Sequence, residues 1–270
     1  MNRKVLYRIF TIIATIAVFI VIGFLAIMIP ANSKAFFHWQ FTKHNTLDWV
    51  QSQASRMEEL PDYDPKVGEY VENMDEQQLE DLMMHVIRYC MWLEDDINIT
   101  VDGHYLKIFR DDEASHMKDV KNVFGEGIIL TLVSILVCIA YLFFLFNRPK
   151  EYYETSRKVP FITLGVLIGV FLAVALYTII DYKYVFEVLL HNALFSGNFS
   201  FSNGVMISMI GEIFPDLFIL IGIGWAVSLA VPVLAFVFYN RHLKKKLAQN
   251  EAKKTKKTET TTANDSFSQI

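Results

Sequence analysis

The stretch "GIILTLVSILVCIAYLFFLF", residues 127–146, decides the fold of this 270-residue chain. It contains no charged residue, and a helix of that length rises about 30 Å, the thickness of the hydrocarbon core of a bilayer. Three further stretches have the same character, at residues 9–29, 160–180 and 217–239. Together with a content of 53% hydrophobic residues, they predict a mainly α, polytopic membrane protein with four transmembrane helices.

The charges between these stretches predict the topology. Lys and Arg gather before the first stretch, between the second and third, and after the fourth. Residues 31–126 instead hold 20 acidic and 9 basic residues, and residues 181–216 hold four acidic residues and one lysine. Cytoplasmic loops are enriched in Lys and Arg, so we expect a multi-pass protein of the cell membrane with both termini cytoplasmic. The two acidic segments should then lie outside together.

These features divide the chain into four parts. Residues 1–30 form an N-terminal transmembrane anchor, because their apolar run is longer than the core of a signal peptide. Residues 31–126 form an extracytoplasmic cap, and residues 127–240 form a three-helix membrane region with an outer loop at 181–216. Residues 241–270 are polar, rich in Lys and Thr and without an apolar face, so we expect a disordered cytoplasmic tail.

The cap sequence predicts a helix followed by a hairpin. In "DEQQLEDLMMHVIRYCMWL", residues 75–93, apolar residues recur at helical spacing, and Asp75 is placed to cap the helix. In "ITVDGHYLKIF", residues 99–109, the pattern alternates about Asp102-Gly103, which is typical of a tight hairpin. We therefore expect a small helical and hairpin cap between the first and second spans.

Two histidines near the outer ends of the spans are the candidates for chemistry. The sequence contains no His-Glu-x-x-His, no phosphate-binding glycine loop and no Gly-x-Ser-x-Gly motif, and we expect no metal and no cofactor. His116 and His191 each lie 11 residues from a span, which is about 16 Å on a continuous helix. Each has an acid one helical turn away, Asp119 and Glu187 respectively. A carboxylate there can hold an imidazole ready as a general base, but the same spacing also fits ordinary surface pairs.

The segment "EASHMKDVKNVF", residues 113–124, resembles the hallmark of a family of four-span bacterial membrane proteins, the lipoprotein intramolecular transacylases. The shared pattern is Glu-x-x-His-Met-x-Asp-Val-Lys-x-x-Phe, preceded by a tyrosine and an Asp-Asp stretch. Residues 189–218 are similar to the second histidine segment of the family and end in Phe-Pro-Asp-Leu-Phe. The family usually has a Trp and an Asp-Pro in this loop, whereas residues 199–205 read "FSFSNGV".

The resemblance implies acyl transfer at the outer leaflet. The substrate would be a bacterial lipoprotein whose N-terminal cysteine carries a diacylglyceryl group. An acyl chain would move from the glycerol to the cysteine amine and leave the lyso form. Donor and acceptor belong to one molecule, so proximity supplies much of the catalysis. The implied partners are diacylglyceryl-modified lipoproteins and membrane lipid, with no nucleic acid.

The resemblance also implies residue roles. His116 and His191 would act jointly as the acid/base pair, without an assignment of which is the base, and Asp119 would orient the imidazole. Neither a serine or cysteine nucleophile nor a metal is then needed. Contacts to the substrate are expected from four further residues: Tyr89, Lys121, Phe195 and Asn198.

Two other interpretations remain open at this point. The chain could be a non-catalytic membrane protein whose acidic extracytoplasmic cap binds a partner or a cationic ligand. Charges within residues 58–81 and 94–96 would then matter more than the histidines. It could also be a small transporter or channel, but the spans contain no charged residue, which argues against this interpretation.

Overall fold

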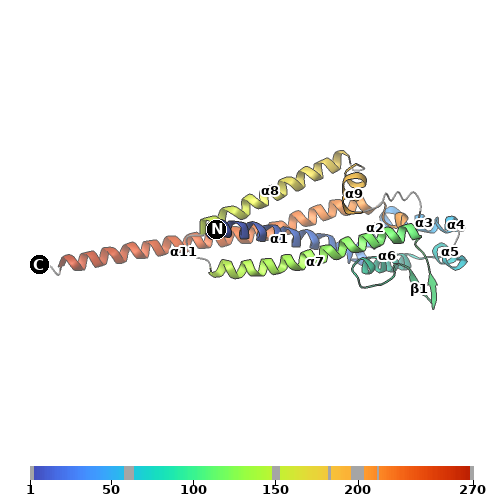
Figure 1. The fold of residues 1–270 in the computed structure, drawn as a ribbon, viewed down its shortest axis with the longest axis horizontal. Coiled ribbons are helices and arrows are strands. Elements are labelled where there is room, and N and C mark those ends of the chain that lie inside the picture. Colours follow the sequence, from blue (N-terminus) through green and yellow to red (C-terminus); the bar gives the residue numbers. More distant parts are fainter. Residues whose placement is uncertain are drawn as a thin grey trace. The chain divides into compact units, whose positions relative to one another are not determined.

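The computed structural model describes residues 3–57, 64–147, 153–181, 184–195, 204–211 and 213–267. The chain divides into two compact units, Met1–Trp225 and Ala226–Ile270. Among the described residues, four helices are long and apolar enough to cross a membrane. The prediction of a mainly α membrane protein with four spans is therefore confirmed (Figure 1).

The four long helices contain the four predicted spans. They are α1 (Arg3–Ala31), α7 (Asp111–Asn147), α8 (Tyr153–Ile180) and α11 (Ile213–Phe267). α7 begins well before its charge-free stretch at Gly127. Three acidic residues occupy its first turn, where negative charge stabilises the positive end of the helix dipole. The first four turns of α7 therefore lie outside the membrane-spanning stretch.

Aromatic and hydroxyl side chains pack α1 antiparallel against α7 (Figure 1). The rings of Tyr7 and Phe144 lie 5.0 Å apart. One turn further along α1, the Tyr141 hydroxyl donates to the Thr11 hydroxyl at 3.3 Å. The start of α1 is therefore beside the end of α7.

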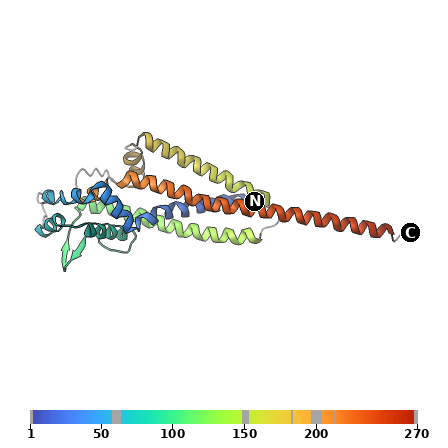
Figure 2. The ribbon, with the colours of Figure 1, turned by 180° about the vertical axis from the view of Figure 1, so that it is seen from behind.

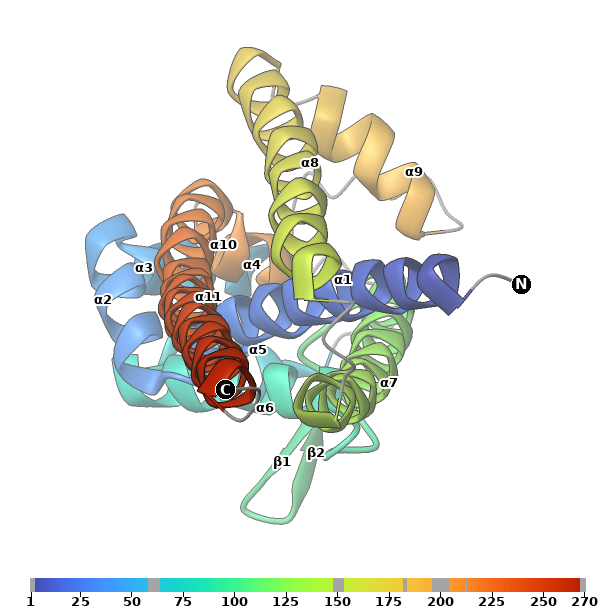
Figure 3. The same cartoon turned by 90° about the vertical axis from the view of Figure 1, so that its left-hand side faces the viewer.

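Trp225 joins the other two long helices to α1 within the first unit. Its ring lies 4.3 Å from Phe19 of α1 and 3.9 Å from Phe171 of α8, edge-on to both. α8 also packs on α1 directly (Figure 3). A buried aromatic ring between three helices fixes their spacing at this level.

The cap lies between α1 and α7 in the chain and consists of short helices and one hairpin. The predicted helix is α6, in which Asp75 accepts from the Gln78 N–H and Gln78 bonds back, a reciprocal capping box. The predicted hairpin is present as well, with positive φ at Asp102 and Gly103 as a tight turn requires. The elements are α2 (Lys34–His44), α3 (Thr46–Gln51), α4 (Ala54–Met57), α5 (Pro65–Glu72), α6 (Glu76–Cys90), β1 (Ile99–Val101) and β2 (His104–Leu106).

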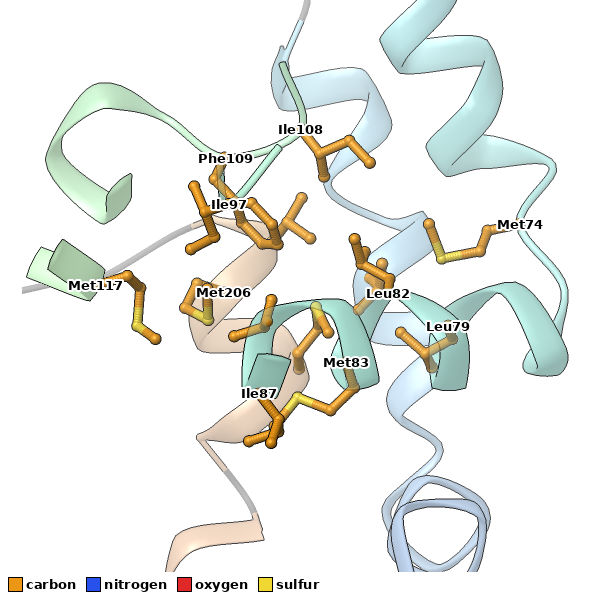
Figure 4. Close-up of a cluster of buried hydrophobic side chains, with 14 of the residues drawn as sticks. Met74, Leu79, Leu82, Met83, Ile87, Ile97, Ile108, Phe109, Met117 and Met206 are labelled. Carbon is orange, nitrogen blue, oxygen red and sulfur yellow. The ribbon is translucent and has the colours of Figure 1, made fainter. Parts of the chain in front are cut away.

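The cap has a continuous hydrophobic core to which other parts of the first unit contribute (Figure 4). α7 adds Met117, and the short helix α10 (Val205–Ile210) adds Met206. The core therefore fixes α7 and the segment before α11 on the cap. The labelled side chains are Met74, Leu79, Leu82, Met83, Ile87, Ile97, Ile108, Phe109, Met117 and Met206.

α11 begins beside the cap (Figure 2). Asp216, in its first turn, accepts from the Lys43 ammonium and lies 3.0 Å from Nε2 of His44, both in α2. Two elements that are more than 170 residues apart in sequence are thereby joined by an ionic cluster.

The condition under which His191 would lie about 16 Å beyond the third span, one continuous α-helix, is not met. α8 ends at Ile180, and a separate π-helix, η2 (Tyr184–Leu190), precedes α9 (His191–Leu194). The Asp181 carboxylate accepts from the Tyr184 N–H at 3.0 Å and so starts a new helix at this point. The height of His191 therefore does not follow from counting residues along α8.

The polar tail, predicted to be disordered, continues α11 as helix to Phe267. Residues 241–270 lack an apolar face, which favours disorder. However, Lys, Ala, Glu and Gln are frequent in the first half of this segment, and all four have high helix propensity. The other boundaries proposed from sequence stay predictions.

Candidate active site

His116 contacts the outer loop that follows α8. Its ring lies 4.9 Å from the ring of Phe195, with an angle of 66° between the planes. Phe195 directly follows α9, whose first residue is His191. The structure thus brings the first histidine and a predicted substrate contact together, one short helix away from the second histidine.

The remaining predicted acid/base residues are described only in part. Asp119 lies one turn beyond His116 on α7 and is half-buried. The side chains of His191 and Glu187 lie outside the described part of the structure, as does the whole of Asn198. The roles of His116, His191 and Asp119 therefore stay predictions.

Tyr89 and Lys121 form a second pair, between α6 and α7. The Lys121 ammonium lies 4.0 Å from the centre of the Tyr89 ring and donates to the Glu94 carbonyl at 2.7 Å. Burial raises the pKa of the Tyr89 hydroxyl, so the phenol stays neutral. Lys121 follows His116 by five residues, which turns it about 140° away around the helix. These contacts hold the end of α6 on α7, and a role in substrate binding stays a prediction.

Glu113 is a site-forming residue to which sequence reasoning gave no role. Its side chain is 1% exposed. One carboxylate oxygen accepts from the Met206 N–H at 2.9 Å, and the other accepts from the Arg110 N–H at 3.0 Å. Burial raises the pKa of the Glu113 carboxyl, and the Arg110 N–H opposes this shift. The first turn of α7 therefore holds the backbone that begins α10.

Gly204 allows this approach. Its φ is +143°, and a Cβ at this position would lie 2.2 Å from Oε1 of Glu113. Only glycine adopts this backbone conformation without strain and leaves room for the carboxylate. The signal in the sequence was the Glu-x-x-His spacing, which places Glu113 one turn before His116 on the same face of α7.

These contacts define what the site can do chemically. α7 contacts two points of the outer loop, Phe195 through His116 and Met206 through Glu113. An imidazole is thus fixed beside the loop, about three helical turns before the charge-free stretch. Imidazole is the side chain best suited to accept and return a proton near neutral pH.

The fold defines the class of protein. It is similar to solved structures of the membrane integral lipoprotein intramolecular transacylase Lit from Bacillus cereus. One shares 17% identity with a TM-score of 0.60 and covers 88% of this chain and 96% of the other. A histidine-to-arginine variant shares 16% identity with a TM-score of 0.59 and covers 93% and 100%. At these identities the likeness shows the fold: an integral membrane protein of four long helices and a cap.

The sequence then defines the family. The sequence model of the family described as "Lipoprotein intramolecular transacylase Lit" matches residues 12–218, and the chain belongs to this family. It is therefore an enzyme, a transacylase integral to the membrane. No curated protein matches the chain.

Proposed function

We propose that this chain moves an acyl chain within a bacterial lipoprotein. The acyl chain leaves the glycerol of the diacylglyceryl group and joins the amine of the N-terminal cysteine of the lipoprotein, which gives the lyso form. Family membership supports transacylation in general. The observation that supports the proposed active site is the distance of 4.9 Å between the rings of His116 and Phe195, which brings the two histidine-bearing segments together.

The chemistry requires only proton transfer and positioning. The cysteine ammonium gives one proton to an imidazole, and the free amine attacks the ester carbonyl to form a tetrahedral intermediate, whose nitrogen gives up a second proton that the histidines pass to the glycerol oxygen. The bond from carbon to the glycerol oxygen then breaks, an amide replaces the ester, and the glycerol oxygen takes up one proton. His116 and His191 share this proton traffic, and Asp119 orients His116 from the next turn. Because donor and acceptor lie in one molecule, the enzyme binds a single substrate.

The proposed topology places the cap outside and both termini in the cytoplasm. The contact between Tyr7 and Phe144 supports it, because it places the basic flanks of α1 and α7 at the same end of the helix pair. The acidic cap is bonded to α7 at the opposite end. The site then lies on the outer side, where lipoproteins are anchored.

Mass spectrometry of a diacylated reporter lipopeptide, incubated with the protein in a bilayer, tests this function. His116→Ala and His191→Ala should each lower the yield of lyso product about 100-fold or more, because general acid–base catalysis contributes that much. His104→Ala is the matched control, since His104 is exposed in the hairpin, where its ring lies 3.1 Å from the Lys66 ammonium.

Unchanged lyso product from both site variants would overturn the proposal. If reversal of the charges at residues 94–96 impaired the protein while the histidine variants were silent, the acidic cap would be the functional surface. Persistence of the diacyl form with the wild-type protein would remove the transacylase reaction altogether.

A further inference from the structure

The turn that ends α6 has tryptophan where the backbone favours glycine. Trp92 has a φ of +63°, in the left-handed region. Its N–H bonds to the Tyr89 carbonyl at 3.1 Å, and the Leu93 N–H bonds to the Arg88 carbonyl at 2.9 Å. This pair of bonds is the Schellman ending of a helix, in which the left-handed position is usually glycine. A bulky residue is strained there, so the side chain of Trp92 has a use of its own.

The indole is fixed on α7 just before the membrane-spanning stretch. Its Nε1 donates to the Lys121 carbonyl at 3.2 Å, and its ring is so close to Gly125 that a Cβ there would lie 2.3 Å from it. In return, the Lys121 ammonium donates to the Glu94 carbonyl at 2.7 Å. The turn at residues 91–94 is therefore bonded to α7 through both Trp92 and Glu94. Its contact with Gly125 lies two residues before Gly127, where the charge-free stretch begins.

This turn presents apolar surface although it belongs to the cap. Trp92 is 56% exposed and Leu93 is 59% exposed. The polar edge of the indole is occupied by the Lys121 carbonyl, so the apolar part of the ring is the part presented. Residues on the side of α7 that Gly125 occupies are also more than half exposed further along the helix: Ile129, Leu132 and Val133.

We propose that the Trp92–Leu93 turn is an interfacial anchor, inserted at the boundary between headgroups and acyl chains of the leaflet next to the cap. The partner is bilayer lipid, because the turn is continuous with the face of α7 that lipid covers. Tryptophan favours this boundary, since it combines a large apolar ring with one polar edge. The anchor fixes the cap at the membrane surface, and it does not rest on the proposed function.

A nitroxide at Leu93 tests the anchor directly. Leu93→Cys is made in full-length protein that carries Cys138→Ala, and the labelled protein is placed in bilayers of phosphatidylcholine and phosphatidylglycerol. Cys90 stays unlabelled, because it is 2% exposed and burial raises the pKa of its thiol to about 12. The readout is the ratio of collisions with oxygen, which partitions into lipid, to collisions with a water-soluble nickel chelate.

Two reference sites calibrate this ratio. Ile129→Cys lies on the lipid-facing surface of α7, and Tyr105→Cys lies at an exposed position of the hairpin. The ratio at Leu93 should be several-fold above that at Tyr105 and approach that at Ile129. A ratio equal to that at Tyr105 would place the turn in water. Protection of Leu93 from both probes would show that protein covers the turn, and either result overturns the proposal.

Trp92→Gly separates the anchor from the backbone. Glycine suits the left-handed position, so this variant retains the helix ending and loses only the indole. The oxygen-to-nickel ratio of the label at Leu93 should fall toward the value at Tyr105. An unchanged ratio in Trp92→Gly would show that Trp92 does not hold the turn at the boundary.

Discussion

The cap and the membrane helices of the first unit bury opposite kinds of side chain. The cap core consists of large apolar residues, among them Leu79 and Phe109 at 0% exposed. Along α1 and α7 the buried positions are mostly small or carry a hydroxyl, and the large apolar residues face outward. The small buried residues and the buried Ser and Thr residues within the two predicted spans are Thr11, Ala14, Ala17, Ala26, Thr131 and Ser134.

The difference follows from the solvent on each side. In water, removal of large apolar surface drives the packing of the cap. Lipid tails are as apolar as leucine, so burial of leucine gains little in the membrane, and small residues that allow close helix contact are buried instead. α7 passes from one regime to the other. Met117 is buried in the cap core, and Ser134 is buried within the membrane stretch.

The largest effect should come from a truncation in the cap core. Leu82→Ala should destabilise the cap by about 2–5 kcal/mol, because it leaves a cavity in a packed core. Leu82 is 2% exposed, whereas Leu132 on α7 is 57% exposed, so Leu132→Ala is the matched control. The rate of thiol labelling at Cys90, in the same core, reports opening of the cap and should rise about 30-fold or more in Leu82→Ala alone. Equal rates in both variants would contradict the comparison.

An enlargement should have its effect in the membrane instead. Ala14 is 2% exposed and lies on the same face of α1 as Thr11 and Tyr7, which contact α7. Ala14→Leu should destabilise the helix pair by about 1–3 kcal/mol through overpacking. The fraction of protein that stays monodisperse after heating in detergent measures this loss of stability. Val133→Leu, at a position 51% exposed, is the control and should have no effect. A more stable Ala14→Leu would show that the membrane helices gain from burial as the cap does.

Glu113 lies at the cap end of α7, where it holds α10, and its loss should act on activity. In Glu113→Gln, one backbone N–H faces an amide NH₂ instead of an acceptor, which costs about 1–3 kcal/mol. We expect kcat/KM for the reporter lipopeptide to fall about tenfold, because α10 and the outer loop are no longer held beside His116. Asp112→Asn is the control, since Asp112 is an exposed neighbouring carboxylate that pairs with Arg110 and accepts from the Glu113 N–H at 3.0 Å, and it does not contact α10 in any described bond. Similar losses in both variants would show that charge, and not the buried acceptor, is what matters.

The sequence predicted those parts of the fold that depend on local signals. The four spans follow from charge-free length, α6 from its periodicity and the Asp75 cap, and the hairpin from Asp102-Gly103. Each of these features is set by residues within a few positions of one another. The family pattern also indicated His116 before its contact with Phe195 was known.

Long-range contacts and one local break were not predictable in this way. The bond from the Met206 N–H to Glu113 joins positions 93 residues apart, and nothing in the local sequence reports it. The need for glycine at position 204 becomes evident only when the structure places the Glu113 carboxylate beside it. The end of α8 at Ile180 was not predictable either, because the apolar pattern favours continuation of the helix and the Asp181 carboxylate that accepts from the Tyr184 N–H is a single side chain within it.

The smallest effect should come from the ionic cluster that joins α11 to the cap. The Lys43 ammonium, and then His44, hold the pKa of the Asp216 carboxyl below its ordinary range. A carboxyl whose pKa is lower in the folded state stabilises the fold above its unfolded pKa. This contribution is lost as the pH falls through the folded pKa, which here lies below that of an unpaired aspartate. Lys43 is 43% exposed, so Asp216→Asn should cost less than about 1 kcal/mol at pH 7.

Melting curves at two pH values distinguish the contribution of the ion pair from that of packing at this cluster. At pH 7 and low salt, Asp216→Asn should melt slightly below wild type, and added salt should narrow the gap, because partly exposed ion pairs are screened. At a strongly acidic pH, below the lowered pKa of the Asp216 carboxyl, the two proteins should melt closer together, since Asp216 itself then loses its charge. A gap that stayed constant with pH and salt would mean that the cap and α11 are joined by packing at this point. The cap core, and not the ion cluster, would then hold the membrane helix in place.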